Sequence, residues 1–346
     1  MQNTAGWTVG LADSEVRFTV GDGETVLAAG LRQGLALPFG CQTGGCASCR
    51  VRCVAGEVDY AIPPSALSPA EVKAGYILMC LARPRSDLTL DLHQPAELAE
   101  LRPRKLPARV IEKRMLAHDV IGLWLKLPKE DRPFRWLAGQ YIDFLLADGR
   151  RRSFSIANAW VRDAPMELHL RITPGGRFAK YVLDEMPERA ILRFEGPLGA
   201  FYLREDSDRP VILMAGGTGF APIKAIVESA LAKSGARRFH LFRGVRSRRD
   251  LYLDELPRQW AGQHASRFAY TPVLSEPDAD WRGESGFVHD IVLKRYPDLA
   301  GAEIYMSGPP VMVQAGKKSF VAAGLDADHL FYDSFDYAFE TWPSLG

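Results

Sequence analysis

Long hydrophobic runs are missing from this chain of 346 residues, and no apolar stretch approaches the ~18 residues that a membrane-spanning helix needs. The first residues, Met1 to Gly6, contain neither a basic region nor an apolar one. We therefore expect no signal peptide, no membrane partner and a cytoplasmic protein. Acidic and basic side chains nearly balance, at a formal net charge of +1, which gives no reason to expect nucleic acid as a partner.

Cysteine is scarce, and four of the five cysteines form one pattern. Cys41, Cys46 and Cys49 have the spacing C-x4-C-x2-C, and Cys80 follows about thirty residues later. This is the plant-type [2Fe–2S] pattern. Two iron ions and two sulfides leave four tetrahedral positions, which soft thiolates fill. We predict that these four cysteines bind a [2Fe–2S] cluster.

Glycines within this loop favour the same interpretation, because Gly44 and Gly45 allow the backbone to turn sharply around a cluster. A structural zinc site is the alternative, although zinc ribbons prefer paired C-x2-C knuckles and the chain has one such pair. Because four of the five cysteines are assigned to a cluster, we expect a reducing compartment rather than a protein held together by disulfides. The fifth cysteine, Cys53, is expected to be a small apolar side chain within the first domain.

The length predicts about two or three domains. Short β-rich runs from Trp7 to about Leu92 surround a helix expected over residues 25–33 and a helix start at Ser68. Three prolines and a basic cluster then follow without periodicity, which indicates a linker; a solvated hinge is favoured over a docking site. The predicted boundaries are a first domain over 1–93, a linker over 94–106, a second domain over 107–206 and a third over 207–346.

Short strands separated by turns dominate the second domain, so we expect an antiparallel β-barrel there. The pattern changes at Arg209. A buried strand over 210–215 precedes an apolar-periodic helix over 222–233, and further buried strands lie at 239–242 and 303–306. Alternating strands and helices predict a parallel α/β sheet for the third domain.

Residues 152–155, Arg-Ser-Phe-Ser, close a strand of the expected barrel. They resemble the Arg-x-Tyr/Phe-Ser flavin signature of the ferredoxin–NADP reductase superfamily. The resemblance implies that Arg152 pairs with a flavin phosphate and that Phe154 packs its flat face against the flavin. Ser155 would hydrogen-bond near the flavin N5, with Ser153 in the same segment. A surface arginine beside a core aromatic is the alternative.

A glycine-opened helix start follows the strand over 169–172, and such an N-terminus suits a pyrophosphate. The resemblance implies that it holds FAD through Gly175, Gly176, Arg177 and Phe178. The family usually has Ser or Thr where this chain has Ala179, so a hydrogen bond to phosphate would be missing. His169 and Arg171 are candidates for lining the flavin, with ordinary strand positions as the alternative.

A second glycine turn lies between the strand over 210–215 and its helix, as a phosphate-binding turn requires. It is similar to the Gly-Gly-Thr-Gly-x-Ala-Pro turn that binds pyridine nucleotides in this superfamily. The resemblance assigns the nucleotide to Gly216, Gly217, Thr218 and Gly219, and implies that Thr218 also reaches the flavin. A glycine turn made for packing is the alternative.

Ser307, Gly308 and Pro309 follow the strand over 303–306, where the family usually has Cys-Gly-Pro-Pro beside the nicotinamide. Serine lacks the polarisable sulfur, which predicts slower hydride transfer. Gly308 and Pro309 would still shape the nicotinamide pocket. Near the end of the chain, Phe335 is the candidate for the aromatic residue that covers the flavin, with interior packing as the alternative.

Arginines at 246, 248 and 249 follow the second strand of the α/β domain, where contacts with the adenosine ribose belong. An arginine here can hold the 2′-phosphate of NADPH. However, Gly-x-Arg is common in NADH-using relatives, so the resemblance favours NADH over NADPH. We expect Arg246 to contact the nucleotide.

The domain order resembles the reductase components of bacterial multicomponent oxygenases, such as benzoate and terephthalate dioxygenase reductases and phenol hydroxylase reductases. It implies a β-grasp ferredoxin domain, an antiparallel β-barrel for FAD and a parallel α/β domain for NAD(P)H. Electrons would pass from NADH to FAD, to the [2Fe–2S] cluster and then to a terminal oxygenase or hydroxylase. Such a protein is expected to be a monomer with a transient partner. The alternatives are a reductase for a deoxysugar dehydrase and a non-catalytic iron–sulfur electron carrier.

Overall fold

The computed structural model describes residues 6–12, 14–35, 37–40, 42–45, 47–92 and 101–335. The chain divides into two compact units, Met1–Arg104 with Pro197–Ala200 and Lys105–Gly196 with Phe201–Gly346. Within the described ranges, no helix combines the length and hydrophobicity that crossing a bilayer requires.

The first unit is built on a five-stranded mixed sheet in the order β2-β1-β7-β3-β5. The strands β1 and β7 run parallel, whereas β1–β2, β3–β7 and β3–β5 pair antiparallel, which is a β-grasp arrangement. The bounds are β1 (Trp7–Leu11), β2 (Arg17–Val20), β3 (Arg50–Ala55), β5 (Tyr76–Leu78) and β7 (Leu88–Asp91), with a ribbon of β4 (Val58–Tyr60) and β6 (Ala82–Pro84).

The helices α1 and α2 begin within one residue of the positions that local signals predicted. Thr25 accepts a hydrogen bond from the Ala28 amide at the start of α1 (Val26–Arg32). Ser68 and Glu71 form a capping box at α2 (Pro69–Lys73). These caps satisfy amides that would otherwise lack a partner, so short helices form at these positions.

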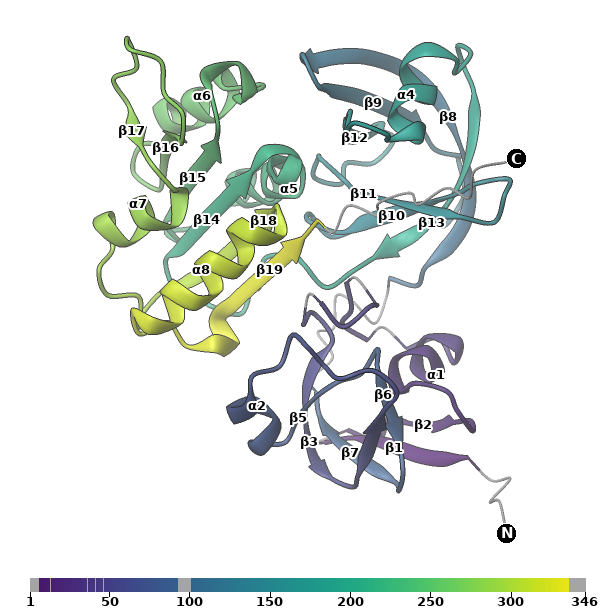
Figure 1. The fold of residues 1–346 in the computed structure, drawn as a ribbon. Helices are drawn as coiled ribbons and strands as arrows, with labels where there is room; N and C mark the ends of the chain where they lie inside the picture. Colours follow the sequence, from purple (N-terminus) through teal and green to yellow (C-terminus); the bar gives the residue numbers. More distant parts are fainter. Residues whose placement is uncertain are drawn as a thin grey trace. The chain divides into compact units, whose positions relative to one another are not determined.

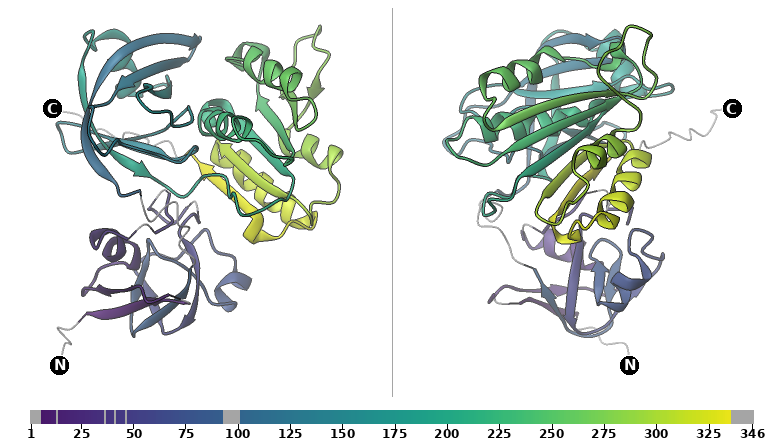
Figure 2. Two further views of the ribbon diagram at one scale, coloured as in Figure 1. Left: turned by 180° about the vertical axis from the view of Figure 1, so that it is seen from behind. Right: turned by 90° about the vertical axis from the view of Figure 1, so that its left-hand side faces the viewer.

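The second unit contains a six-stranded barrel in the order β11-β10-β13-β8-β9-β12. A bridge between Ile156 and Leu168 joins its two edge strands, so the sheet curls around one core (Figure 2). The strand β8 begins at Arg104 and thus includes the last residues of the expected linker. The elements are β8 (Arg104–Ala117), β9 (Val120–Lys126), β10 (Tyr141–Leu145), β11 (Arg151–Ser155), β12 (Met166–Arg171), α4 (Arg177–Asp184) and β13 (Ile191–Leu198).

The rest of this unit is a parallel sheet in the order β17-β16-β15-β14-β18-β19 (Figure 1). The chain first adds strands on one side of β14 and then crosses to add β18 and β19 on the other. The strand order therefore reverses between β14 and β18, and ligands bind at such switch points. The strands are β14 (Val211–Gly216), β15 (Phe239–Val245), β16 (Phe268–Leu274), β17 (Glu284–Ser285), β18 (Glu303–Gly308) and β19 (Leu330–Ser334).

Helices cover both faces of the parallel sheet. One face packs against α5 (Phe220–Leu231) and α6 (Glu255–Gln263), with Phe220, Ile223 and Trp260 in the core. The other packs against α7 (Val288–Arg295) and α8 (Pro310–Ala322), which lie in front of the sheet in Figure 1. Burial on both faces explains why β14 and β18 consist of continuous apolar runs.

His240 of β15 makes the stability of the folded protein depend on pH. Its ring nitrogens lie 2.8 Å from the Tyr296 hydroxyl and 2.8 Å from the Thr271 hydroxyl. Burial and the charge of Arg295 lower the pKa of His240 to about 4. Below its ordinary pKa of about 6.5, the unfolded chain takes up a proton that the folded chain refuses until about pH 4. Stability should therefore fall as the pH drops through this range.

We expect the native chain to lose about 2 kcal/mol more unfolding free energy between pH 7 and pH 5 than His240→Gln does. Urea unfolding of the full chain at both pH values measures this difference. Between pH 7 and pH 8 the difference between the two proteins should stay constant. Equal losses in acid would show that His240 does not cause the dependence.

Candidate functional site

The loop that carries three of the cluster cysteines bends through backbone conformations that few residues adopt. Gln42, Gly44 and Ala47 all have positive φ, and Gly44 has φ +82°. A Cβ at Gly44 would lie 2.4 Å from Leu81 Cδ1. Glycine suits position 44 because any residue with a Cβ would be strained at this positive φ.

Cys49 and Cys80 are both buried in the first unit, and neither forms a disulfide within the described part of the chain. The Met79 amide donates a hydrogen bond of 3.1 Å to the Cys49 carbonyl, so the residue before Cys80 is joined to Cys49. Cys41 and Cys46 lie outside the described residues. Buried thiols on adjoining segments, next to a sharply bent loop, fit a thiolate-bound cluster.

The two segments expected at FAD meet through aromatic rings. Phe154 of β11 lies 5.4 Å from Phe178 of α4 and 5.8 Å from Phe144 of β10, between ring centroids. On the same strand, the Ser153 hydroxyl donates to Asp143, and Arg152 Nη1 donates to the Arg151 carbonyl at 2.9 Å. The flat, half-buried ring of Phe154 fits contact with a planar ligand.

The start of α4 suits a phosphate. Gly176 is its N-cap and makes no side-chain capping hydrogen bond, and Gly175 has φ +79°. A glycine N-cap places no side chain over the start of α4, and a helix N-terminus of this kind suits an anion. Ala179 is buried in the barrel core. These features fit a flavin pyrophosphate, and the assignment of Gly175, Gly176, Arg177 and Phe178 to FAD stays a prediction.

The nucleotide turn and the end of β18 are in direct contact at the switch point. Thr218 is buried in the single turn Gly217–Gly219 that leads into α5. A Cβ at Gly219 would lie 2.1 Å from the Ser307 carbonyl oxygen, and one at Gly216 would lie 2.9 Å from Pro309 Cδ. The glycines therefore allow two strand ends to approach more closely than side chains would permit.

Arg171 extends from the barrel to the same turn. Its Nη2 lies 2.8 Å from Asp119 Oδ2, and a Cβ at Gly217 would lie 2.5 Å from its Nη1. A guanidinium beside a glycine turn fits recognition of a phosphate. The sequence analysis named Arg171 as a candidate for lining the flavin, and the structure places its guanidinium beside the predicted nucleotide turn.

Four candidate residues from different elements converge here. The Ser155 hydroxyl donates to Asp333 Oδ2 at 3.4 Å, and Asp333 pairs with Ser307 across β19 and β18. The Phe335 amide donates to the Gly308 carbonyl at 3.0 Å. Ser307 is fully buried, and its hydroxyl has no hydrogen-bond partner among the described residues. An orphaned polar group between the two cofactor segments fits a ligand contact at this point. We call Ser155, Thr218, Ser307, Asp333 and Phe335, which lie on the segments that meet here, the switch-point group.

The arginines after β15 face an acidic loop. Arg248 Nη2 lies 3.3 Å from Asp278 Oδ1 and 3.6 Å from Asp280 Oδ2, and its guanidinium lies over the Trp281 ring. The carbonyl of Arg246 accepts a hydrogen bond from the Glu276 amide at 2.8 Å, which holds the acidic loop against the arginine segment. The side chain of Arg246 is exposed.

Both ring nitrogens of His169 are engaged by other residues of the protein. His169 is buried between Glu167 and Tyr252, at 2.8 Å and 3.1 Å from its two ring nitrogens. Sequence analysis missed Glu167, Lys224 and Asp333. The first two interrupt apolar runs, and a charged residue inside a buried strand or helix is the signal that could have identified them.

Three family models match the chain in the order of its domains. A 2Fe-2S iron–sulfur cluster binding domain covers residues 9–85. An oxidoreductase FAD-binding domain covers residues 107–202, and an oxidoreductase NAD-binding domain covers residues 213–318. With the fold and site described above, these matches define an iron–sulfur flavoprotein oxidoreductase that uses NAD.

Relatives match almost the whole chain. The CDP-6-deoxy-L-threo-D-glycero-4-hexulose-3-dehydrase reductase of Yersinia pestis is 36% identical, over 94% of this chain and 98% of the relative. The reductase component of phenol 2-monooxygenase from Pseudomonas sp. is 34% identical, over 91% and 90%. The crystal structure of the Amycolatopsis cytochrome P450 reductase GcoB is 33% identical, with a TM-score of 0.75 over 95% and 98%. The chain belongs to the family of iron–sulfur flavoprotein reductases that includes the reductase components of multicomponent oxygenases.

Proposed function

We propose that this protein takes electrons from NADH and passes them through FAD and the [2Fe–2S] cluster to a partner oxygenase. The observation that carries the proposal is the switch-point group. A hydrogen bond from Ser155 joins the strand expected at the flavin to β19, and the predicted nucleotide turn packs closely against Ser307 at Gly219. A nicotinamide and a flavin ring would have to meet in such a place.

In this proposal NADH would supply a hydride, and FAD would convert this two-electron transfer into one-electron transfers. A [2Fe–2S] cluster accepts electrons one at a time. The chain supplies position. Thr218 and Ser307 would orient the nicotinamide, Ser155 would hydrogen-bond the flavin, and Phe335 would cover its ring. No nucleophile or acid–base pair is needed for this chemistry.

The partner is proposed from the relatives. The phenol 2-monooxygenase, propane 2-monooxygenase and aromatic O-demethylase relatives are reductase components or subunits of those systems. We favour a transient encounter of a monomeric, cytoplasmic reductase with an oxygenase or hydroxylase. A reductase for a deoxysugar dehydrase is the second candidate, because a relative of that name is 36% identical over 94% of the chain. Supplying each kind of partner and measuring NADH-dependent product formation would separate the two.

Anaerobic addition of NADH to the purified protein tests the electron path. The visible spectrum should show overlapping flavin and iron–sulfur absorption, and both should bleach with NADH. Iron–sulfur absorption without a reducible flavin would replace this proposal with an electron carrier. A colourless preparation would point to a structural zinc protein.

NADPH should be a poorer donor than NADH. The arginine at 248 is paired with Asp278 and Asp280, and Glu276 lies on the same loop. A 2′-phosphate would have to compete with these carboxylates for the guanidinium. The acidic loop therefore supports the preference for NADH that the resemblance implied.

Asp278→Asn with Asp280→Asn should raise the kcat/KM for NADPH relative to NADH about fivefold, because exposed ion pairs contribute up to about 1 kcal/mol. Steady-state reduction of ferricyanide with each nucleotide measures this ratio. Asp206→Asn is the control, since Asp206 is exposed in the segment before β14, at the opposite end of the parallel strands from the arginines after β15. An unchanged ratio in the double variant would remove the acidic loop from nucleotide selection.

A further inference from the structure

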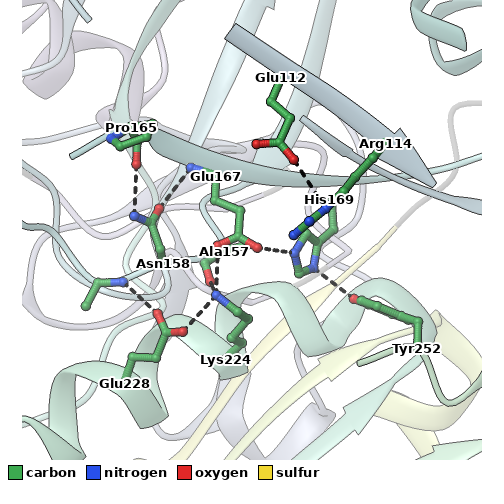
Figure 3. Close-up of polar contacts among 11 residues, drawn as sticks. Glu112, Arg114, Ala157, Asn158, Pro165, Glu167, His169, Lys224, Glu228 and Tyr252 are labelled. Carbon is green, nitrogen blue, oxygen red and sulfur yellow. Dashed lines mark hydrogen bonds and ion pairs between the residues drawn. The ribbon is translucent and has the colours of Figure 1, made fainter. Parts of the chain in front are cut away.

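Lys224, in the second turn of α5, is buried and uses all three of its ammonium protons. Its Nζ lies 2.9 Å from the Ala157 carbonyl, 2.8 Å from Glu167 Oε2 and 2.8 Å from Glu228 Oε1 (Figure 3). Two of these three acceptors belong to the barrel and the third to α5 itself. Because each of the three ammonium protons has its own acceptor, the position of Lys224 relative to these acceptors is fixed. The ammonium group therefore holds α5 in a defined position against the barrel.

The contacts continue on both sides of Lys224. Glu167 Oε1 accepts from His169 Nε2, because a carboxylate can only accept, and this leaves His169 Nδ1 to accept from the Tyr252 hydroxyl. On the other side, Glu228 Oε2 accepts from the Ala159 amide at 3.3 Å. We call Glu167, His169, Lys224, Glu228 and Tyr252 the buried latch.

The charges of the latch are set by burial and by each other. Burial alone would raise the pKa of Glu167, but His169 and Lys224 outweigh it and hold that pKa below its ordinary value. Burial lowers the pKa of His169, and the hydrogen bond to Glu167 opposes this. The groups that face His169 are Glu167, Lys224, Tyr252 and the buried Arg243. His169 is therefore a neutral hydrogen-bonding link.

The latch joins the two segments that would hold the two cofactors. Lys224 lies on α5, whose N-terminus continues directly from the Gly217–Gly219 turn. Glu167 and His169 lie on β12, which runs on to Arg171 and the glycine loop before α4. Resting on the function proposed above, we infer that Glu167 and Lys224 are positioning residues that set the distance between the nicotinamide and the flavin.

The expected effect follows from the geometry that hydride transfer requires. Reacting atoms must lie about 3–3.5 Å apart, and a displacement of about 1 Å can cost about a hundredfold in rate. Nucleotide affinity depends on contacts along the whole molecule and is far less sensitive to such a shift. A defect in the latch should therefore appear in the rate of flavin reduction rather than in the binding of NADH.

Stopped-flow reduction of the holoprotein by NADH, without oxygen, tests this in Lys224→Met and Glu167→Gln. The saturating rate should fall about tenfold or more, while the NADH concentration for the half-maximal rate changes less than about threefold. Hydrogen exchange gives a second measurement that needs no turnover. The amide of Ala159 should exchange faster in Lys224→Met, because its acceptor Glu228 loses the ammonium.

The double variant Lys224→Met with Glu167→Gln distinguishes a loss of cofactor positioning from a loss of protein stability. It leaves fewer unpaired buried charges than Lys224→Met alone, so its thermal stability should recover. The reduction rate should stay low if the latch positions the cofactors. Recovery of the rate together with stability would overturn the inference, as would native rates and native exchange in the single variants.

Lys233→Met is the matched control, since Lys233 also pairs with a glutamate, Glu205, but both side chains are exposed. It should reduce its flavin at the native rate. Failure of the native protein to bleach with NADH would contradict the proposed function itself. A bleaching native protein with unaffected latch variants would contradict only this inference.

Discussion

Replacing Cys80 with alanine is expected to abolish electron delivery from NADH to a one-electron acceptor protein such as cytochrome c. The flavin should still bleach when NADH is added without oxygen. Cys80 is buried beside the segment that contains Cys49, and a methyl group cannot replace a thiolate in the coordination of iron. The cluster would be lost, whereas the barrel and the parallel sheet belong to the other compact unit.

Visible absorption, iron content and cytochrome c reduction together measure this result. Loss of the cluster with unchanged flavin bleaching would place the cluster after FAD in the electron path. Full cytochrome c reduction without iron would show that the flavin serves the acceptor directly, and the proposed order of transfer would be wrong.

The chain contains its own control in Cys53. This half-buried thiol donates to the Ala55 carbonyl at 3.2 Å, and burial raises its pKa. It is thus a protonated side chain rather than a thiolate ligand. Cys53→Ala should retain iron content, the spectrum and cytochrome c reduction.

Gly219→Ala is expected to have the second large effect, the loss of NADH-driven flavin bleaching. The backbone of Gly219, at φ −58° and ψ −13°, suits alanine, so conformational strain is not the cause. The cause is space: the new Cβ would lie 2.1 Å from the Ser307 carbonyl oxygen and 2.7 Å from the Gly308 nitrogen. These are backbone atoms of a buried strand, and they cannot rotate away as a side chain can.

We expect Gly219→Ala to lower the unfolding free energy by about 3 kcal/mol, a cost typical of overpacking, as measured by urea unfolding. Dithionite should still bleach the flavin, because the barrel strand and α4 are unchanged. Gly262→Ala is the matched control. It lies in α6 with nothing within 4 Å of an added Cβ, and alanine there should stabilise the helix by about 1 kcal/mol. Normal bleaching in Gly219→Ala would show that the two turns do not need this close approach.

Local patterns predicted much of the fold. Ser68 caps a helix as expected, and the helix predicted from Thr25 begins one residue later with Thr25 as its cap, because a helix start depends on residues within one turn. The continuous apolar runs of β14 and β18 predicted a parallel sheet for the same local reason. The cysteine spacing predicted the cluster domain that the family model matches.

The contacts between distant segments could not be predicted in this way. Ser155 and Asp333 are hydrogen-bonded although they are 178 residues apart in the sequence. The residues next to either one contain no pattern that predicts this contact. The sequence marks Lys224 only as a charged residue in an apolar helix, and the barrel supplies two of its acceptors. His169 was a flavin candidate because it lies on the correct strand, and only the structure shows Tyr252 beside it.

The reversal of strand order between β14 and β18 has a consequence for how the protein is made. The chain leaves the ribosome from its N-terminus, so β14 is complete long before β18 and β19 exist. Pairing of distant parallel strands is slow, because the intervening chain must first be ordered. The contacts of Gly219 with Ser307 and of Ser155 with Asp333 therefore close late. A nascent chain therefore has the residues of its cluster loop and of β11 before it has the residues of β18 that the proposed nicotinamide site needs.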